Sequence, residues 1–294
     1  MDIETILLIQ QIMNGLVNGM TYVLIATGLT LVFGVLHIIN FAHGEFYMLG
    51  AFFTFFASKL LGLDYVTAGI LATVAVASLG IVANRFFFWP LRREHEFTLL
   101  LSSLGLALLL TNGGELIFGA DPKYISSPFA DGIVAMGPMI LTQQRILIFG
   151  IGALMLVLLY FFIQKTTMGK MMRATAQDAE GAALTGVDIR RVYTVTFVLA
   201  CGLAALAGAL VGPTAMIYPT VGSWAVLKGF IVVVLGGLGS IVGALIGGLT
   251  LGVVEALVGG YISLGFAQAV GFAIIIVVLL WRPNGLFGVA RRAG

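Results

Sequence analysis

Long apolar stretches, separated by short polar segments, recur from one end of this 294-residue chain to the other. Several run for 18 residues or more, which is enough for a helix to cross a hydrocarbon core about 30 Å thick. Only 10% of the residues are charged, whereas soluble domains carry about 25%. A membrane β-barrel would instead show segments of about 10 residues with alternating polarity. The sequence therefore predicts an all-α, polytopic membrane helix bundle.

Eight apolar stretches are candidate membrane spans, and one of them is longer than a single crossing requires. They cover residues 11–36, 44–61, 66–88, 97–118, 145–164, 192–213, 227–258 and 265–281. The long stretch, 227–258, contains the glycine-rich run from Leu235 to Ser240. This run predicts a broken or re-entrant piece followed by a full span. We therefore expect about 8–9 membrane segments in one transmembrane domain that covers residues 1–294.

The basic residues indicate the orientation of the bundle, because Lys and Arg are enriched in short cytoplasmic loops. We place the segments 89–96 and 165–191 and the C-terminal tail inside. Eleven basic residues are then cytoplasmic: Arg85, Arg92, Arg93, Lys165, Lys170, Arg173, Arg190, Arg191, Arg282, Arg291 and Arg292. Four remain for the outer side: Lys59, Lys123, Arg145 and Lys228. This orientation predicts an external N-terminus, an odd number of crossings after Val221, and external loops at 119–144 and 214–226.

The polar segment 165–191 holds five of the 15 Lys and Arg residues and three of the 13 Asp and Glu residues. Thr175 and Asp178 have the spacing of a capping box, with Asp in place of Glu. Several alanines and Leu184 favour a short helix after them, and Gly186 supplies the residue just past its end. The segment is therefore predicted to be ordered, and Asp188 can cap the span that follows.

A helix of two to three turns is marginal when isolated in water. The predicted helix therefore needs a surface to pack against, either a groove in a partner protein or the face of the lipid bilayer. It lacks a large aromatic or aliphatic face, and anionic lipid would repel Asp178 and Glu180. These two features favour docking to a partner protein.

A second polar segment, between the first two predicted spans, contains Asn40, His43 and Glu45. Ionisable groups at membrane depth are expensive and usually mark a pathway or a relay. The alternative is a polar cytoplasmic turn, with Asn40 as the N-cap of the second span and the other two residues in its first turn. Both interpretations stay open, and the three residues are candidates for a translocation path.

Gly236 and Gly237 occupy a comparable place in the second half of the chain. Glycine-interrupted segments in both halves of a transporter are typical of inverted repeats around a central site. These two glycines are therefore further candidates for the translocation path. The carboxylates Glu115 and Glu255 are expected at capping or interfacial positions.

The sequence shows no enzyme site. Gly169-Lys170-Met171 lacks the hydroxyl and the upstream glycine of a phosphate-binding loop, so any ATP must bind to another chain. No Cys/His group has the spacing of zinc ligands, and we expect neither a metal nor a cofactor. A net charge of +2 is too small to indicate nucleic-acid binding.

Four segments resemble the inner-membrane permease subunits of ABC importers for branched-chain amino acids, the LivH type. They are Asn40-Phe-Ala-His-Gly-Glu45, Arg173-Ala-Thr-Ala-Gln-Asp178 with Gly186-Val187, Val234-Leu-Gly-Gly-Leu-Gly-Ser-Ile241, and Arg282-Pro-Asn-Gly-Leu-Phe287. The resemblance implies that segment 165–191 carries a coupling helix that sits in a cleft of an ATPase subunit. The implied contact residues are Arg173, Asp178, Glu180, Ala183 and Gly186. Gly181 departs from the family pattern, in which a larger apolar residue is more usual.

The resemblance also implies the assembly and its location, a multi-pass protein of the bacterial inner membrane. Its partners would be two ABC ATPase subunits, a second permease subunit of similar fold, a soluble substrate-binding protein that delivers the small-molecule substrate, and membrane lipid. The family also includes permeases for urea, short amides and other amino acids, so these substrates are alternatives. A rival class is a stand-alone secondary transporter or channel, which would transport in liposomes without any ATPase.

Overall fold

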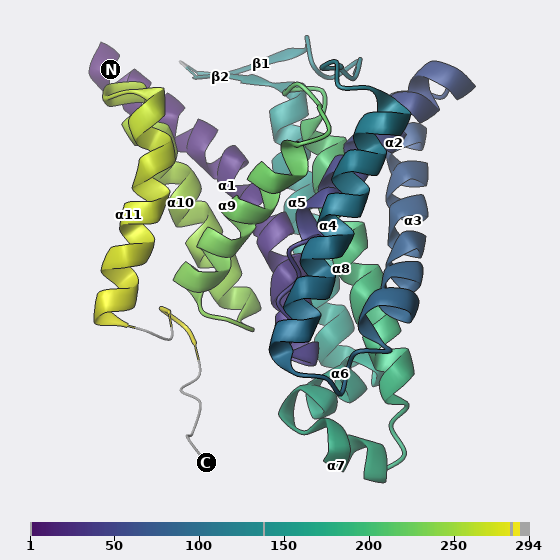
Figure 1. Cartoon of the computed structure of the whole chain (residues 1–294). Helices are drawn as coiled ribbons and strands as arrows, with labels where there is room; N and C mark the ends of the chain where they lie inside the picture. Colours follow the sequence, from purple (N-terminus) through teal and green to yellow (C-terminus); the bar gives the residue numbers. More distant parts are fainter. Residues whose placement is uncertain (1, 138, 283–284, 289–294) are drawn as a thin grey trace.

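The computed structural model describes residues 2–137, 139–282 and 285–288, and it shows a helical bundle with one small hairpin (Figure 1). The helices are α1 (Ile3–Leu36), α2 (His43–Leu61), α3 (Tyr65–Ala83) with the π-helical turn η1 (Asn84–Phe88), α4 (Glu96–Phe118), α5 (Gln143–Lys165), α6 (Thr167–Gln177), α7 (Ala179–Leu184), α8 (Ile189–Val211), α9 (Val221–Gly236), α10 (Ile241–Tyr261) and α11 (Leu264–Trp281). The strands are β1 (Ile133–Met136) and β2 (Met139–Thr142). The predicted polytopic all-α class is confirmed.

Within the described residues, seven helices are long and apolar enough to cross a membrane: α1, α3 with η1, α4, α5, α8, α10 and α11. Helix α9 is apolar but shorter, with 16 residues. Helix α2 has 19 residues and carries polar groups in its first turn. Each predicted span corresponds to one long helix, except 227–258, which forms both α9 and α10. From Val221 onward the described chain forms three helices, of which α10 and α11 are long enough to span a membrane, and the predicted orientation stays a prediction.

The break between α9 and α10 lies in the predicted glycine run. Gly237 and Gly239 have φ angles of 100° and 85°, a left-handed conformation that glycine adopts without the penalty of a Cβ atom. Ser240 then caps α10, because its Oγ accepts a hydrogen bond from the amide of Gly243 at 3.0 Å. The chain reverses direction here within four residues.

Helix α1 is the central element of the bundle. In its most apolar stretch 89% of the residues are buried, compared with 11% in α11. Helix α1 packs along α10 at a crossing made of glycines, where a Cβ at Gly252 would lie 2.4 Å from Gly19 Cα. Lipid does not drive apolar faces together, so membrane helices associate through close backbone approach of this kind. This glycine crossing packs the subunit internally.

The two ends of the bundle differ in construction (Figure 1). At one end, the hairpin end, β1 and β2 pair in antiparallel register with Ile133 opposite Thr142. The two loops predicted to be external meet there, because Lys123 and Ile217 exchange two backbone hydrogen bonds of 2.9 and 3.0 Å. The other end, the α6–α7 end, carries the two short helices of segment 165–191.

Basic residues gather at the α6–α7 end. The guanidinium groups of Arg92 and Arg190 both lie over the ring of Trp89, at 3.9 and 5.9 Å from its centroid. The segment 89–96 and the start of α8 are therefore neighbours, as their common predicted side requires. Arg291 and Arg292, predicted on the same side, lie outside the described residues.

Candidate functional site

Segment 165–191 lies at the end of the bundle and forms two helices, α6 and α7, whereas the sequence predicted only one. Thr166 caps α6, since its Oγ1 accepts from the amide of Gly169 at 3.0 Å. Helix α6 turns sharply away from α5, and a Cβ at Gly169 would lie 2.2 Å from the Ile163 carbonyl oxygen. Only glycine fits a backbone approach this close.

The predicted capping box is wrong in its first residue. Thr175 lies inside α6, where its hydroxyl donates to the carbonyl of Met171 at 2.9 Å. Asp178 alone caps α7, by accepting from the amide of Glu180 at 3.0 Å. An Asp side chain satisfies a free helix N–H without help from a second capping residue, so the helix starts three residues later than the box predicted.

The end of α7 follows the prediction. Gly186 has a φ angle of 89°, and the amide of Val187 bonds to the carbonyl of Ala182 at 3.1 Å, as in a glycine-terminated helix. Asp188 caps α8, because its carboxylate accepts from the amide of Arg191 at 3.1 Å.

Four of the five residues predicted to contact an ATPase lie together on the exposed side of this end. They are Asp178, Glu180, Ala183 and Gly186. The fifth, Arg173, is half-buried and turned inward, where its guanidinium donates to the Ile163 carbonyl of α5. Arg173 therefore joins α6 to α5. At the unusual Gly181, a Cβ would lie 2.5 Å from Asp178 Oδ2, so the glycine leaves room for the capping carboxylate.

The polar group Asn40, His43 and Glu45 lies inside the bundle. The turn interpretation correctly places Asn40 before α2 and the other two residues in its first turn, but they are not at an exposed end of the bundle. His43 Nε2 is 3.1 Å from the carbonyl oxygen of Ile25. Helix α1 continues to Leu36, eleven residues or about 16 Å beyond Ile25. Helix α2 therefore begins well within the bundle.

The three polar side chains are almost completely buried, at 1%, 0% and 2% exposure in chain order. Asn40 precedes the cap residue Ala42, whose amide donates to Asn40 Oδ1 at 3.0 Å. Glu45 faces the first turn of α9, where a Cβ at Gly222 would lie 2.5 Å from its Oε2. These residues do not line an open passage in this conformation, and their place on a translocation path stays a prediction.

The glycines Gly236 and Gly237 form a junction with the C-terminal segment. The amides of Leu286 and Phe287 donate to the carbonyls of Leu235 and Gly236, both at 3.0 Å. The last carbonyls of a helix have no partner within it, so the segment satisfies the end of α9. Leu286 and Phe287, at the end of the resembled motif, therefore have a structural role here. The place of the two glycines on a translocation path also stays a prediction.

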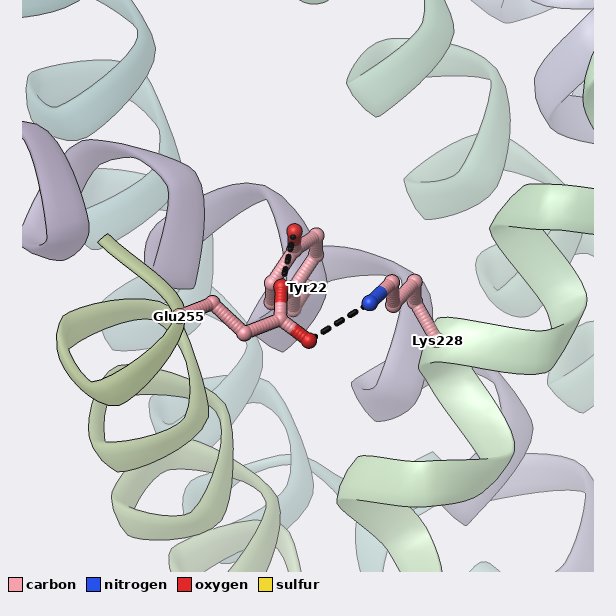
Figure 2. Close-up of polar contacts among 3 residues, drawn as sticks. All are labelled: Tyr22, Lys228 and Glu255. Atoms are coloured by element: carbon pink, nitrogen blue, oxygen red, sulfur yellow. Dashed lines mark hydrogen bonds and ion pairs between the residues drawn. The ribbon is translucent and has the colours of Figure 1, made fainter. Parts of the chain in front are cut away.

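A polar cluster that was not predicted lies near the hairpin end (Figure 2). Lys228 of α9 forms an ion pair with Glu255 of α10, with 2.5 Å between Nζ and Oε1. Tyr22 of α1 donates its hydroxyl to the other carboxylate oxygen, Oε2, at 2.8 Å. The Lys228 and Glu255 side chains are only 5% and 10% exposed. Both side chains are therefore buried in the bundle, and Glu255, in the middle of α10, does not cap a helix.

These three residues line a cavity of about 430 Å³ between α1, α9, α10 and α11. Its other polar lining residues are Gln11, Asn14, Asn18, Arg145 and Gln268. On α1 the polar lining residues fall at positions 11, 14, 18 and 22, which share one helix face. This stripe is the sequence signal that could have revealed the cavity, because polar residues at helical spacing inside a membrane span are expected to face the bundle interior.

The comparisons with known proteins agree with one another. The family described as branched-chain amino acid transport system / permease component matches residues 11–279. The high-affinity branched-chain amino acid transport system permease protein LivH of Salmonella typhimurium is 38% identical over 95% of each chain. The corresponding protein BraD of Pseudomonas aeruginosa is 37% identical, again over 95% of each chain. LivM of Escherichia coli, a permease protein of the same kind of system, is 23% identical over 92% of this chain and 69% of its own. The chain therefore belongs to the family of branched-chain amino acid transport system permease components, which are multi-pass membrane transport subunits and not enzymes.

Proposed function

We propose that this chain is the permease subunit through which branched-chain amino acids enter the cytoplasm, driven by ATP hydrolysis in separate ATPase subunits. The observation that carries the proposal is the exposed surface of α7. Leu184 is 90% exposed on a helix of only six residues, next to the exposed Ala183 and Glu180. Burying a leucine side chain that is otherwise exposed to water gains about 1.5–3 kcal/mol, so a pocket on a partner protein would stabilise this tip.

The family supports the wider assembly. Its relatives are named as permease proteins of a transport system, and this chain is similar to both LivH and LivM. We infer that two ATPase subunits dock at the α6–α7 end and that a second, LivM-like permease packs beside this chain. A soluble binding protein would deliver the substrate at the hairpin end. The whole chain acts as one transmembrane domain.

Helix α6 could transmit a conformational change from the ATPase subunits to the membrane helices. A cavity of about 300 Å³ separates α6 from the turn between α9 and α10, with Arg173, Gly34 and Gly239 in its lining. Because Arg173 ties α6 to the end of α5, a push on α6 and α7 would move α5 as well. The cavity leaves room for α6 to shift. Alternating access requires an element with two positions, and α6 would be that element.

Coexpression with candidate ATPase subunits tests the proposal. The native chain should retain an ATPase through purification and import leucine into proteoliposomes only when ATP and the binding protein are present. Leu184→Asp should abolish ATPase copurification. Tyr124→Asp is the matched control, because Tyr124 is 61% exposed in the loop at the opposite end. Leucine transport by the chain alone, or retention of the ATPase by Leu184→Asp, would overturn the proposal.

A further inference from the structure

The cavity lined by the three residues of Figure 2 holds charges that neither packing nor ATPase docking explains. An ion pair in a bundle interior is costly, because both ions lose their hydration, and apolar residues of similar volume often serve stability equally well. Ionisable groups at such positions mark sites of function more often than sites of structure. The pair Lys228–Glu255 lies near the hairpin end, away from α6 and α7, and it faces a cavity.

The charges that line the cavity are not balanced. Of the described lining residues, Lys228 and Arg145 are cationic, whereas Glu255 alone is anionic. Both oxygens of the Glu255 carboxylate are already occupied, one by Tyr22 and one by Lys228. A Lys ammonium has three N–H donors, and one of those of Lys228 bonds to Glu255. The excess positive charge and the remaining donors therefore suit a ligand with a carboxylate.

The rest of the lining suits the other parts of an α-amino acid. The side-chain amides of Gln11 and Asn18 carry oxygens that can accept from an ammonium group. Trp224 and Leu264 provide apolar surface. A volume of about 430 Å³ lies within the usual range for small-molecule sites, about 300–1,000 Å³.

We propose that this cavity is a binding site for α-amino acids, in which Lys228 and Arg145 hold the carboxylate and Glu255, fixed by Tyr22, orients Lys228. This inference rests on the proposed function, since it names the substrate groups that the permease itself contacts. A neighbouring cavity of about 230 Å³ shares Tyr22 and Arg145 with it and reaches Thr214 in the loop before α9. The site is therefore adjacent to the loops of the hairpin end, where the substrate would arrive.

Ligand protection of a cysteine tests binding directly. Gln268 is exposed and lines the cavity, and the native Cys201 is fully buried, so Gln268→Cys provides the accessible thiol in the assembled transporter. L-leucine and isovalerate should slow its reaction with a maleimide. L-leucinol, which lacks the carboxylate, should need at least a tenfold higher concentration, as expected for the loss of one charge-assisted hydrogen bond. Equal protection by leucinol, or no protection by leucine, would overturn the inference.

A double variant separates ligand binding from structural support. Lys228→Gln with Glu255→Gln removes both charges, so it leaves neither ion buried alone. It should keep native assembly and thermal stability but lose leucine protection, and ATP-driven leucine uptake should fall at least tenfold. The control, Lys59→Gln with Glu115→Gln, removes the same two charges at exposed positions and should leave uptake unchanged. Native uptake by the Lys228/Glu255 double variant would show that the pair is structural.

The two proposals can fail separately. A native complex that binds no ATPase and imports no leucine would refute the proposed function, whatever the labelling shows. A native complex that imports leucine with unchanged labelling of Gln268→Cys would refute the binding site alone.

Discussion

The two ends of the molecule use polar side chains in opposite ways. At the α6–α7 end the capping carboxylates are exposed and bond to near neighbours, as Asp178 does to the amide of Glu180. In the cavity near the hairpin end, Glu255 is bonded to Lys228, 27 residues away, and to Tyr22, 233 residues away. One arrangement shapes a single short helix, whereas the other connects three helices.

This difference determines what the loss of one group should cost. Water can replace a missing partner at an exposed cap, so the cost stays near that of one hydrogen bond. A buried charge left without its partner pays most of its desolvation penalty. Four predictions test this contrast, from the largest expected effect to the smallest.

The largest effect should come from breaking the buried ion pair. Lys228→Met leaves the Glu255 carboxylate in the bundle with Tyr22 as its remaining partner. We expect the free energy of unfolding to fall by about 3–5 kcal/mol, measured by denaturant unfolding in detergent. The double variant Lys228→Gln with Glu255→Gln should recover most of this loss. If the single variant were no less stable than the double variant, the pair would not be a buried, coupled pair.

At the other end, the largest effect should come from the backbone of Gly186. Its φ angle of 89° places an L side chain in a conformation that costs about 1–2 kcal/mol. We expect Gly186→Val to loosen the junction between α7 and α8 and to weaken ATPase copurification, with little change in the unfolding of the rest of the bundle. Gly186→Asn is the matched control, because Asn tolerates the left-handed region. Equal behaviour of the two variants would contradict this explanation.

Removal of the cap of α7 should have a smaller effect. Asp178→Ala removes the acceptor for the Glu180 amide, at a cost of about 1 kcal/mol. The loss should appear as faster hydrogen exchange in residues 179–184, measured by mass spectrometry. Asp178→Asn keeps an acceptor and should exchange at nearly the native rate. Protection that is unchanged in Asp178→Ala would mean that packing through Ala182, and not the cap, holds this helix.

The same contrast explains what the sequence could predict. The caps at Asp178 and Asp188, the helix end at Gly186 and the break at Gly237 depend on residues within one or two turns, so their residue types indicated them. The capping box was wrong because Thr175 and Asp178 share the spacing of a box without forming one.

Non-local structure was beyond the same reasoning. Nothing near Lys228 in the sequence shows that Glu255 is its partner, because α9 and α10 meet only after the chain reverses at the glycine turn. The depth of His43 stayed open between two interpretations for the same reason, since it depends on where α2 starts relative to Ile25. The sequence could have indicated only the polar stripe from Gln11 to Tyr22. This stripe lines the α1 side of the cavity and does not show which other helices complete it.

The smallest effect is expected at Asp64, and it tests whether exposure, and not the end of the bundle where a residue lies, determines the cost of losing its bond. Asp64 precedes α3, at the same end of that helix as the Tyr65 side chain that bonds to Gln144, yet it is fully exposed. Hydrogen bonding to Thr67 holds the pKa of its carboxyl below the ordinary value of 3.8. A carboxylate with a lowered folded-state pKa stabilises the fold above its unfolded pKa, and this stabilisation is lost as the pH falls through the folded value. The start of α3 should therefore fray only below pH 3.8, seen as a relative rise in hydrogen exchange of residues 65–68.

Asp64→Asn, which does not titrate, should lack this step. A step of the same size in both proteins would assign it to another group, and a loss that spread through the bundle would contradict the rule that exposed, local bonds have local effects.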